Sequence, residues 1–237
     1  MIVEPRTLSR GSDRRLYTVA ALVAIVVVFA GFAQTYFMKG LFGTPALPGL
    51  LHLHGALMTL WFVLFLTQVR LVAARRVDLH RRLGIAGAVL AASILVVGVT
   101  TAINGARLGH SPGPPPLVFL VVPLGDMLVF GTLVATALYF RRRSDIHRRL
   151  MLLACVGILT AAIARIPLAF VHSGGVLVAF LLMSLGVVAC VIFDSVKNRR
   201  LHAAFGWGAL FVIASWPLRL LLAGTPAWIH FATWLTA

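Results

Sequence analysis

Apolar residues along the chain form seven long runs, separated by short breaks that carry charge or Gly and Pro. Each run is close to the 20 or so residues that a helix needs to cross about 30 Å of hydrocarbon. No ten-residue stretch alternates apolar and polar positions as the strands of a transmembrane barrel do. The pattern predicts an all-α integral membrane bundle, one domain over 1–237, with spans near 16–37, 50–73, 83–104, 116–140, 149–171, 175–194 and 203–223.

The composition supports a membrane location. Hydrophobic residues make up 60% of the chain and charged residues 11%, with a mean hydropathy of +0.99. A soluble domain carries about a quarter of its residues as charged side chains, so this chain has too few to cover a solvated surface. Cys155 and Cys190 fall inside predicted spans, where we expect them to pack as small apolar side chains rather than form a disulfide.

The basic residues are distributed unevenly. Of the 21 Lys and Arg residues, 17 fall at the N-terminus or after the second, fourth and sixth runs. Seven alternating spans place them all on one side, which the positive-inside rule makes the cytoplasm. We therefore expect a bacterial inner-membrane protein with a cytoplasmic N-terminus and an external C-terminus. The net charge of +15 then reflects topology and anionic headgroups, and no nucleic-acid partner is expected.

A short basic motif opens three of the predicted spans. It reads DLHRRLG at 78–84, DIHRRLM at 145–151 and, more loosely, NRRLHAAFG at 198–206. Asp78, Asp145 and Asn198 are expected to be helix N-caps. The motif places three histidines at one depth on the cytoplasmic rim: His80, His147 and His202. Three interpretations stay open for them: hydrogen bonds to headgroups or loop carbonyls, ligation of haem or a metal by two of them, or a quinone headgroup site.

Six polar residues from six spans share a second layer, in the outer third of the membrane: Gln34, His54, Asn104, Asp126, Arg165 and Arg219. With about 1.5 Å of rise per residue, they lie roughly 22 to 31 Å from the basic turns. A charge near the bilayer centre costs at least about 2.5 kcal/mol and normally faces a partner or water. As the only acidic residue expected inside the hydrocarbon, Asp126 should meet Arg165 and Arg219. The result is either a structural ion pair or a pocket open to the outside, and nearby prolines favour the pocket.

The segment HLHG at 52–55 contributes two histidines that cannot face the same point. Residues two apart are about 200° apart around a helix. We expect His54, which precedes Gly55, to face the bundle. His52 should lie nearer the surface, at a height comparable to that of His172.

The histidines also supply candidate ligands for haem b. A bis-histidine site needs two histidines at similar depth on facing helices, with cationic groups near the propionates. On the outer side His52 or His54 could pair with His172, near Arg165 or Arg219. On the inner side His80 could pair with His147 or His202.

Two resemblances bear on function. The HLHG, LHRRLG, HRRLM and PLGDM segments resemble, over nearly the whole chain, a group of bacterial multi-pass inner-membrane proteins to which no activity is attached. The histidine pattern more faintly resembles transmembrane b-type cytochromes. That second resemblance implies haem, and electron transfer to quinone or ferric iron.

The expected function is therefore haem- or quinone-linked electron transfer, with two alternatives from other classes. A transporter or channel could use the charged layer as a site for a small anion or proton. A non-catalytic accessory subunit, in an oligomer or larger membrane complex, could use the layer only to hold helices together. Neither a Ser, His and Asp constellation nor an HExxH motif occurs, so hydrolase or protease chemistry is not supported, and whether the protein is an enzyme stays open.

Overall fold

The computed structural model describes residues 7–237, with the side chains of residues 7–14 and of His172 outside the described part. Within it, seven helical stretches are long and apolar enough to cross a membrane, and no strand is present. The prediction of an all-α, multi-pass membrane bundle is confirmed. Apolar runs form helices in lipid because a helix satisfies its own backbone hydrogen bonds.

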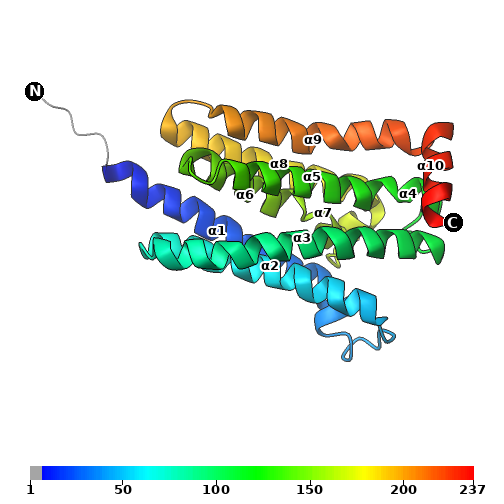
Figure 1. Cartoon of the computed structure of the whole chain (residues 1–237). Coiled ribbons are helices and arrows are strands. Elements are labelled where there is room, and N and C mark those ends of the chain that lie inside the picture. The colour runs from blue at the N-terminus through cyan, green and yellow to red at the C-terminus, as the bar shows by residue number, and fades with distance from the viewer. Residues whose placement is uncertain (1–6) are drawn as a thin grey trace, which may run out of the picture.

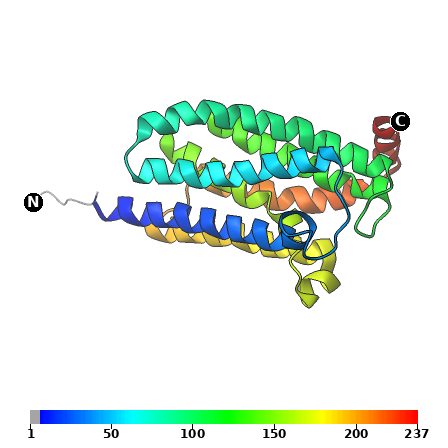
Figure 2. The same cartoon turned by 90° about the horizontal axis from the view of Figure 1, so that it is seen from below.

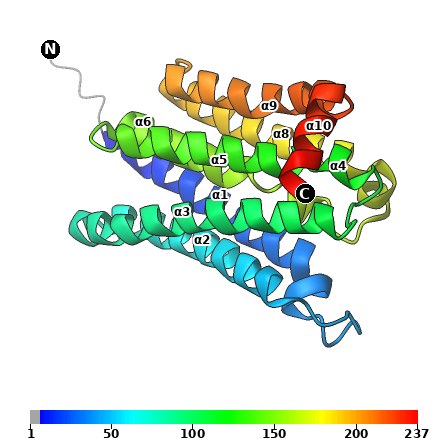
Figure 3. The same ribbon diagram turned by 45° about the vertical axis from the view of Figure 1, so that its right-hand side comes forward.

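The helices run in chain order as α1 (Thr7–Phe32), α2 (Gly49–Ala73), α3 (Val77–Arg107), α4 (Pro116–Phe119), α5 (Val121–Tyr139), α6 (Ser144–Gly157), α7 (Thr160–Ile163), α8 (Ala169–Asn198), α9 (Ala203–Ala223) and α10 (Pro226–Thr236). A turn of π-helix, η1 (Ala33–Phe37), continues α1. The long helices lie side by side, and α10 crosses the end of the bundle beside α3 and α4 (Figures 1 and 3).

The two ends of the bundle differ in charge. The basic end holds the turns at 74–76, 140–143 and 199–202, and the far end holds α10, η1 and the link between α7 and α8. The N-terminal part of α1 lies at the basic end and the C-terminus at the far end (Figure 1). Helix α8 lies alongside α1, as seen from below in Figure 2.

Helix α6 is the centre of the bundle. In its span the buried share is 72%, against 17–39% in the other six spans. The side chains of this span therefore contact mainly protein, whereas those of the other spans contact mainly lipid. It packs against α1, α5, α8 and α9. The approach of α9 depends on Gly208, because a Cβ there would collide with Leu153 of α6.

The fifth span differs from its prediction. It was expected over 149–171, but helix begins at Ser144, is interrupted after Gly157 and ends at Ile163, and α8 already begins at Ala169. Pro167 accounts for the early end, because proline lacks an amide and disfavours helical backbone in the residue before it. Helix α8 bends again at Gly175, whose φ of 54° and ψ of −142° suit only glycine.

The expected N-caps are wrong. The residues that precede α3, α6 and α9 are Arg76, Arg143 and His202, and none of them caps through its side chain. Asp78 and Asp145 lie in the first turns instead, where a negative charge still favours the helix dipole. Asn198 is the last residue of α8.

Helix α10 has no counterpart among the predicted spans. Thr225 caps it, since its hydroxyl oxygen accepts a hydrogen bond from the Trp228 amide, and Pro226 is its first residue. With 11 residues it is too short to cross a bilayer, so a pattern of long apolar runs does not predict it.

Candidate functional site

Asp126 and Arg219 form an ion pair between α5 and α9. The distance from Nη1 of Arg219 to Oδ1 of Asp126 is 2.6 Å, and both side chains are largely buried. Nη2 also donates to Oγ of Ser215 at 3.1 Å. The guanidinium lies against Gly125, where a Cβ would collide with it, so this glycine lets α9 bring its cation close to α5.

An apolar groove of about 570 Å³ lies beside this ion pair. It runs between α5 and α9 as far as α10, and Ser215 and Arg219 are the polar residues that line it. In a bilayer such a groove faces hydrocarbon, and lipid chains suffice to fill it.

Arg165 does not join the ion pair. Among the described residues no ion pair links it to Asp126; its Nη1 donates to the Ala161 carbonyl at 2.8 Å, and its Cζ lies 5.0 Å from the centre of the Phe32 ring. The end of α1 that carries Phe32 continues into η1, whose Tyr36 ring lies against Gly55 beside His54 of α2. The three charged residues that we expected to meet are therefore divided between two places.

The remaining members of the outer layer are Gln34 in η1 and Asn104 in α3. Gln34 and Asn104 are exposed. Asn104 lines a separate small hollow together with Leu50 and Arg107. The six residues share a depth, but they do not form one cluster.

The two histidines of the HLHG segment have different surroundings. His54 is half-buried and His52 is exposed, which agrees with an inward His54. The Tyr36 hydroxyl donates to the backbone carbonyl of His52 at 3.1 Å, and the two rings lie 5.9 Å apart. The side chain of His172, a candidate haem ligand, lies outside the described residues, so its pairing with His52 or His54 stays a prediction.

At the basic end, His80 of α3 and His147 of α6 face each other. Their ring centres are 6.3 Å apart and the ring planes differ by 80°. Nδ1 of His147 lies 2.8 Å from the Ala137 carbonyl oxygen in α5. Because a carbonyl can only accept, Nδ1 donates this hydrogen bond, and in the neutral ring Nε2 is then the nitrogen with the lone pair.

The surroundings of His80 contain unsatisfied polar atoms. Its Nδ1 and Oε1 of Gln68 are both buried without a hydrogen-bond partner. Gly84 lies one turn along the same face of α3, and a Cβ there would meet nothing nearer than Nε2 of Gln68 at 3.8 Å. Buried polar atoms normally have partners, so this neighbourhood is suited to a ligand.

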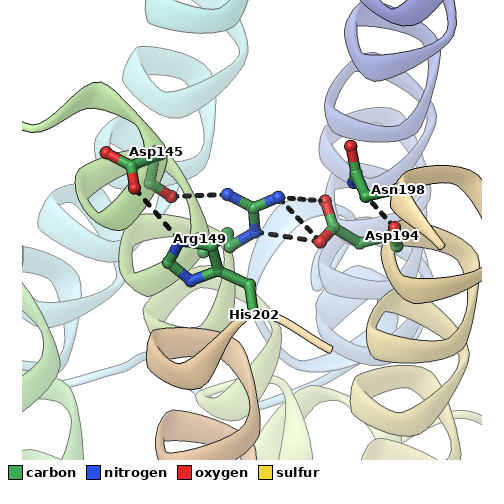
Figure 4. Close-up of polar contacts among 5 residues, drawn as sticks. All are labelled: Asp145, Arg149, Asp194, Asn198 and His202. Carbon is green, nitrogen blue, oxygen red and sulfur yellow. Dashed lines mark hydrogen bonds and ion pairs between the residues drawn. The ribbon is translucent and has the colours of Figure 1, made fainter. Parts of the chain in front are cut away.

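His202 belongs to a different cluster, which Figure 4 shows in close-up. Its Nε2 lies 3.0 Å from Oδ2 of Asp145, and it does not pair with His80. The centre of the cluster is Arg149, whose Nε and Nη2 each donate to Asp194 at 2.9 Å while Nη1 donates to the Asp145 carbonyl at 2.8 Å (Figure 4). Asn198 donates to the Asp194 carbonyl at 2.7 Å.

Sequence reasoning missed the Arg149–Asp194 pair. Arg149 was assigned to the rim, and Asp126 was expected to be the only acid inside the hydrocarbon. In the structure both side chains are buried in the bundle, since Asp194 is 1% exposed and Arg149 is 3% exposed. One signal in the sequence was available: Asp194 directly follows the apolar segment VIF and precedes the last turn of the span, which indicates that it still lies within the helix.

The described residues contain no group of three or more His, Cys, Asp or Glu residues placed to hold a metal ion. Cys155 and Cys190 are buried free thiols, as expected. The chain matches no family model, no curated protein and no solved structure in the three comparisons. The functional proposal therefore rests on the residues and their contacts.

Proposed function

We propose that this multi-pass membrane protein transfers electrons through a haem b held by His80 and His147. The separation of the two imidazoles carries the proposal. Two imidazoles that ligate one metal from opposite faces have ring centres about 6 Å apart, since each metal–nitrogen bond is about 2 Å and each nitrogen lies about 1 Å from its ring centre. The observed separation is 6.3 Å.

The protonation of His147 also suits a ligand. Metal-bound histidines usually donate their second ring N–H to a carbonyl or carboxylate, which fixes the tautomer and the ring orientation. The contact with Ala137 does this for His147 and leaves Nε2 able to coordinate. His80 would contribute its own lone pair from the opposite side.

Nearby residues suit the rest of the macrocycle. Gly84 places no side chain beside His80, and the nearest atom to a Cβ there would be Nε2 of Gln68 at 3.8 Å. Arg81 and Arg82 follow His80 directly, are exposed at the basic end and could pair with propionates. Bound haem would supply a one-electron couple near one membrane surface, so a quinone in the bilayer is a suitable electron partner.

The location belongs to the same proposal. Basic turns at one end favour a cytoplasmic position for that end in a bacterial inner membrane, so the haem would lie near the cytoplasmic side.

An absorption spectrum of protein purified in detergent from haem-supplied cells tests the proposal. We expect a Soret band, with α and β bands that sharpen on reduction with dithionite. His80→Ala and His147→Ala should each abolish these bands. His230→Ala, which changes an exposed histidine on α10, is the matched control and should keep them.

His202→Ala separates the two inner pairs considered above. If His202 were the partner of His80, this variant would lose the bands while His147→Ala kept them. A folded but colourless wild-type protein, or bands that survive both His80→Ala and His147→Ala, would exclude the His80–His147 site.

A further inference from the structure

We propose that Arg165 and His54 form a binding site for an oxyanion, a phosphate or carboxylate group, at the far end of the bundle. This site is separate from the haem proposal, since it lies at the opposite end and uses none of the same residues. The inference rests on three observations: an arginine whose charge no described carboxylate neutralises, a histidine in the part of α2 that packs against η1, and irregular backbone at the ends of α1 and α7.

The partners of the acidic residues show whether a carboxylate is available to neutralise Arg165. Among side chains that the structure describes, the carboxylates belong to Asp78, Asp126, Asp145 and Asp194. Asp126 pairs with Arg219, Asp194 pairs with Arg149 and Asp145 contacts His202. Asp78 lies in the first turn of α3 at the basic end. The C-terminal residue accepts a hydrogen bond from Arg107 at 3.2 Å. In the described part of the chain, no carboxylate is left for Arg165.

The known contacts of Arg165 do not neutralise it. One Nη1 hydrogen bond goes to a carbonyl of its own helical turn, and the Phe32 ring faces the guanidinium at 5.0 Å. A guanidinium has five N–H donors in a planar fork that matches an oxyanion, so donors remain for a ligand. The residue lies at the surface of the bundle.

His54 adds a second group at the same place. It precedes Gly55, which packs against Tyr36 of η1, while Arg165 packs against Phe32 at the adjoining end of α1. The neutral ring of His54 has one N–H to donate. An oxyanion between the two side chains would be attracted by the arginine and could accept from both. Repulsion between Arg165 and a protonated His54 would likewise be relieved by a negative charge between them.

The backbone around this site is irregular in two segments. These are the π-helical turn η1 and the link between Ile163 and Ala169. Close contacts hold both in place, since a Cβ at Gly31 would collide with the Ala162 carbonyl and one at Gly55 with the Tyr36 ring. Such departures from helix are tolerated at depth where they line a cavity, and π-turns are frequent at functional sites.

Titration calorimetry on the purified full-length protein tests the site with two probes. Inorganic phosphate tests a free anion, and the short-chain lipid dihexanoyl phosphatidate tests a headgroup. We expect saturable binding of at least one probe, with a dissociation constant at least tenfold higher in Arg165→Gln. Arg107→Gln, which removes one positive charge from the same end, should change the dissociation constant less than twofold.

The outcomes separate the two sources of the anion. Binding of the lipid alone identifies a headgroup site, and binding of phosphate identifies a site for free oxyanions; either supports the proposal. The proposal is overturned if neither probe saturates, or if Arg107→Gln weakens binding as much as Arg165→Gln does. Haem content plays no part in this readout, so its failure is distinct from failure of the proposed function.

A second pair of variants covers poor folding of Arg165→Gln. His54→Ala should weaken binding at least threefold, whereas His230→Ala, at the same end, should leave it unchanged. Arg165→Lys keeps the charge and should retain saturable binding. Equal affinity in His54→Ala and His230→Ala would remove His54 from the site and overturn the two-residue proposal.

Discussion

The guanidinium of Arg149 is held inside the bundle by both oxygens of Asp194 and by the backbone carbonyl of Asp145 (Figure 4). Two charges that are taken out of water need each other, because the lone partner would be left unsolvated. The geometry also joins α6, α8 and the start of α9, since Asp145 holds His202 as well. A small set of polar contacts thus connects three helices at the basic end.

We expect Asp194→Ala to lower the free energy of unfolding by about 3–5 kcal/mol, because it leaves Arg149 buried and unpaired. The double variant Arg149→Ala/Asp194→Ala should recover part of this loss. Unfolding in a denaturing detergent, followed by circular dichroism, measures the effect. Asp78→Ala, at an exposed site, is the control. A double variant no more stable than Asp194→Ala would contradict the account.

The Asp126–Arg219 pair leads to a similar expectation at the far end. Asp126→Ala should lower the midpoint of thermal unfolding far more than Arg142→Ala, since Arg142 is exposed in the α5–α6 turn and Arg219 is 6% exposed. Fluorescence-detected size-exclusion chromatography after heating gives both midpoints. Equal midpoints would mean that the buried pair adds nothing to stability.

At the scale of elements, close approach between helices depends on a few glycines. Gly31 of α1 lies directly against the Ala162 carbonyl of α7, and Gly98 of α3 lies against the Met127 side chain of α5. Small residues serve this purpose in membranes, where association depends on close packing rather than on a hydrophobic driving force. The backbone of Ala162 cannot move aside as the flexible side chain of Met127 can. An added Cβ is therefore tolerated less well at Gly31 than at Gly98.

Gly31→Ala should therefore destabilise the protein by about 1–3 kcal/mol, as overpacking does in a well-packed core. Gly105→Ala is matched to it, because a Cβ there meets nothing within 4 Å. Thermal unfolding of the two variants side by side provides the comparison. If Gly31→Ala proves as stable as Gly105→Ala, α1 and α7 do not approach as closely as described.

At the scale of the whole molecule, α6 connects the features at the two ends. Its first turns carry His147 and Arg149 at the basic end, and the span that it begins leads to Arg165 at the far end. Because α6 belongs to the most buried span, a side chain substituted along it would contact other helices rather than lipid. The proposed haem site and the proposed anion site thus lie at opposite ends of the central span that α6 begins.

The orientation of the molecule gives a prediction at this scale. A cysteine introduced at Arg142 should react with a membrane-impermeant maleimide only in inside-out vesicles, and one at Lys39 only in intact spheroplasts, if the basic end is cytoplasmic. Cys155 and Cys190 are buried and should contribute little labelling. The opposite labelling pattern would reverse the orientation.

Residue counting along the spans did not determine which residues meet. It predicted one level for Asp126, Arg165 and Arg219, yet only Asp126 and Arg219 form an ion pair among the described residues. Likewise, His80 had two possible partners at equal depth, and packing selected His147. Residue counting gives height along a helix axis, whereas contact also requires the rotation of each helix and the order of its neighbours.

The sequence by itself determined that this protein is a seven-span helical membrane bundle, because in lipid an apolar run of sufficient length must satisfy its own backbone hydrogen bonds. Only the tertiary structure decided which polar residues meet, that Asp194 is buried against Arg149, and that the fifth span breaks before Pro167. These outcomes depend on side-chain packing between helices distant in sequence. Their energies are set by neighbours that no local pattern of apolar and polar residues specifies.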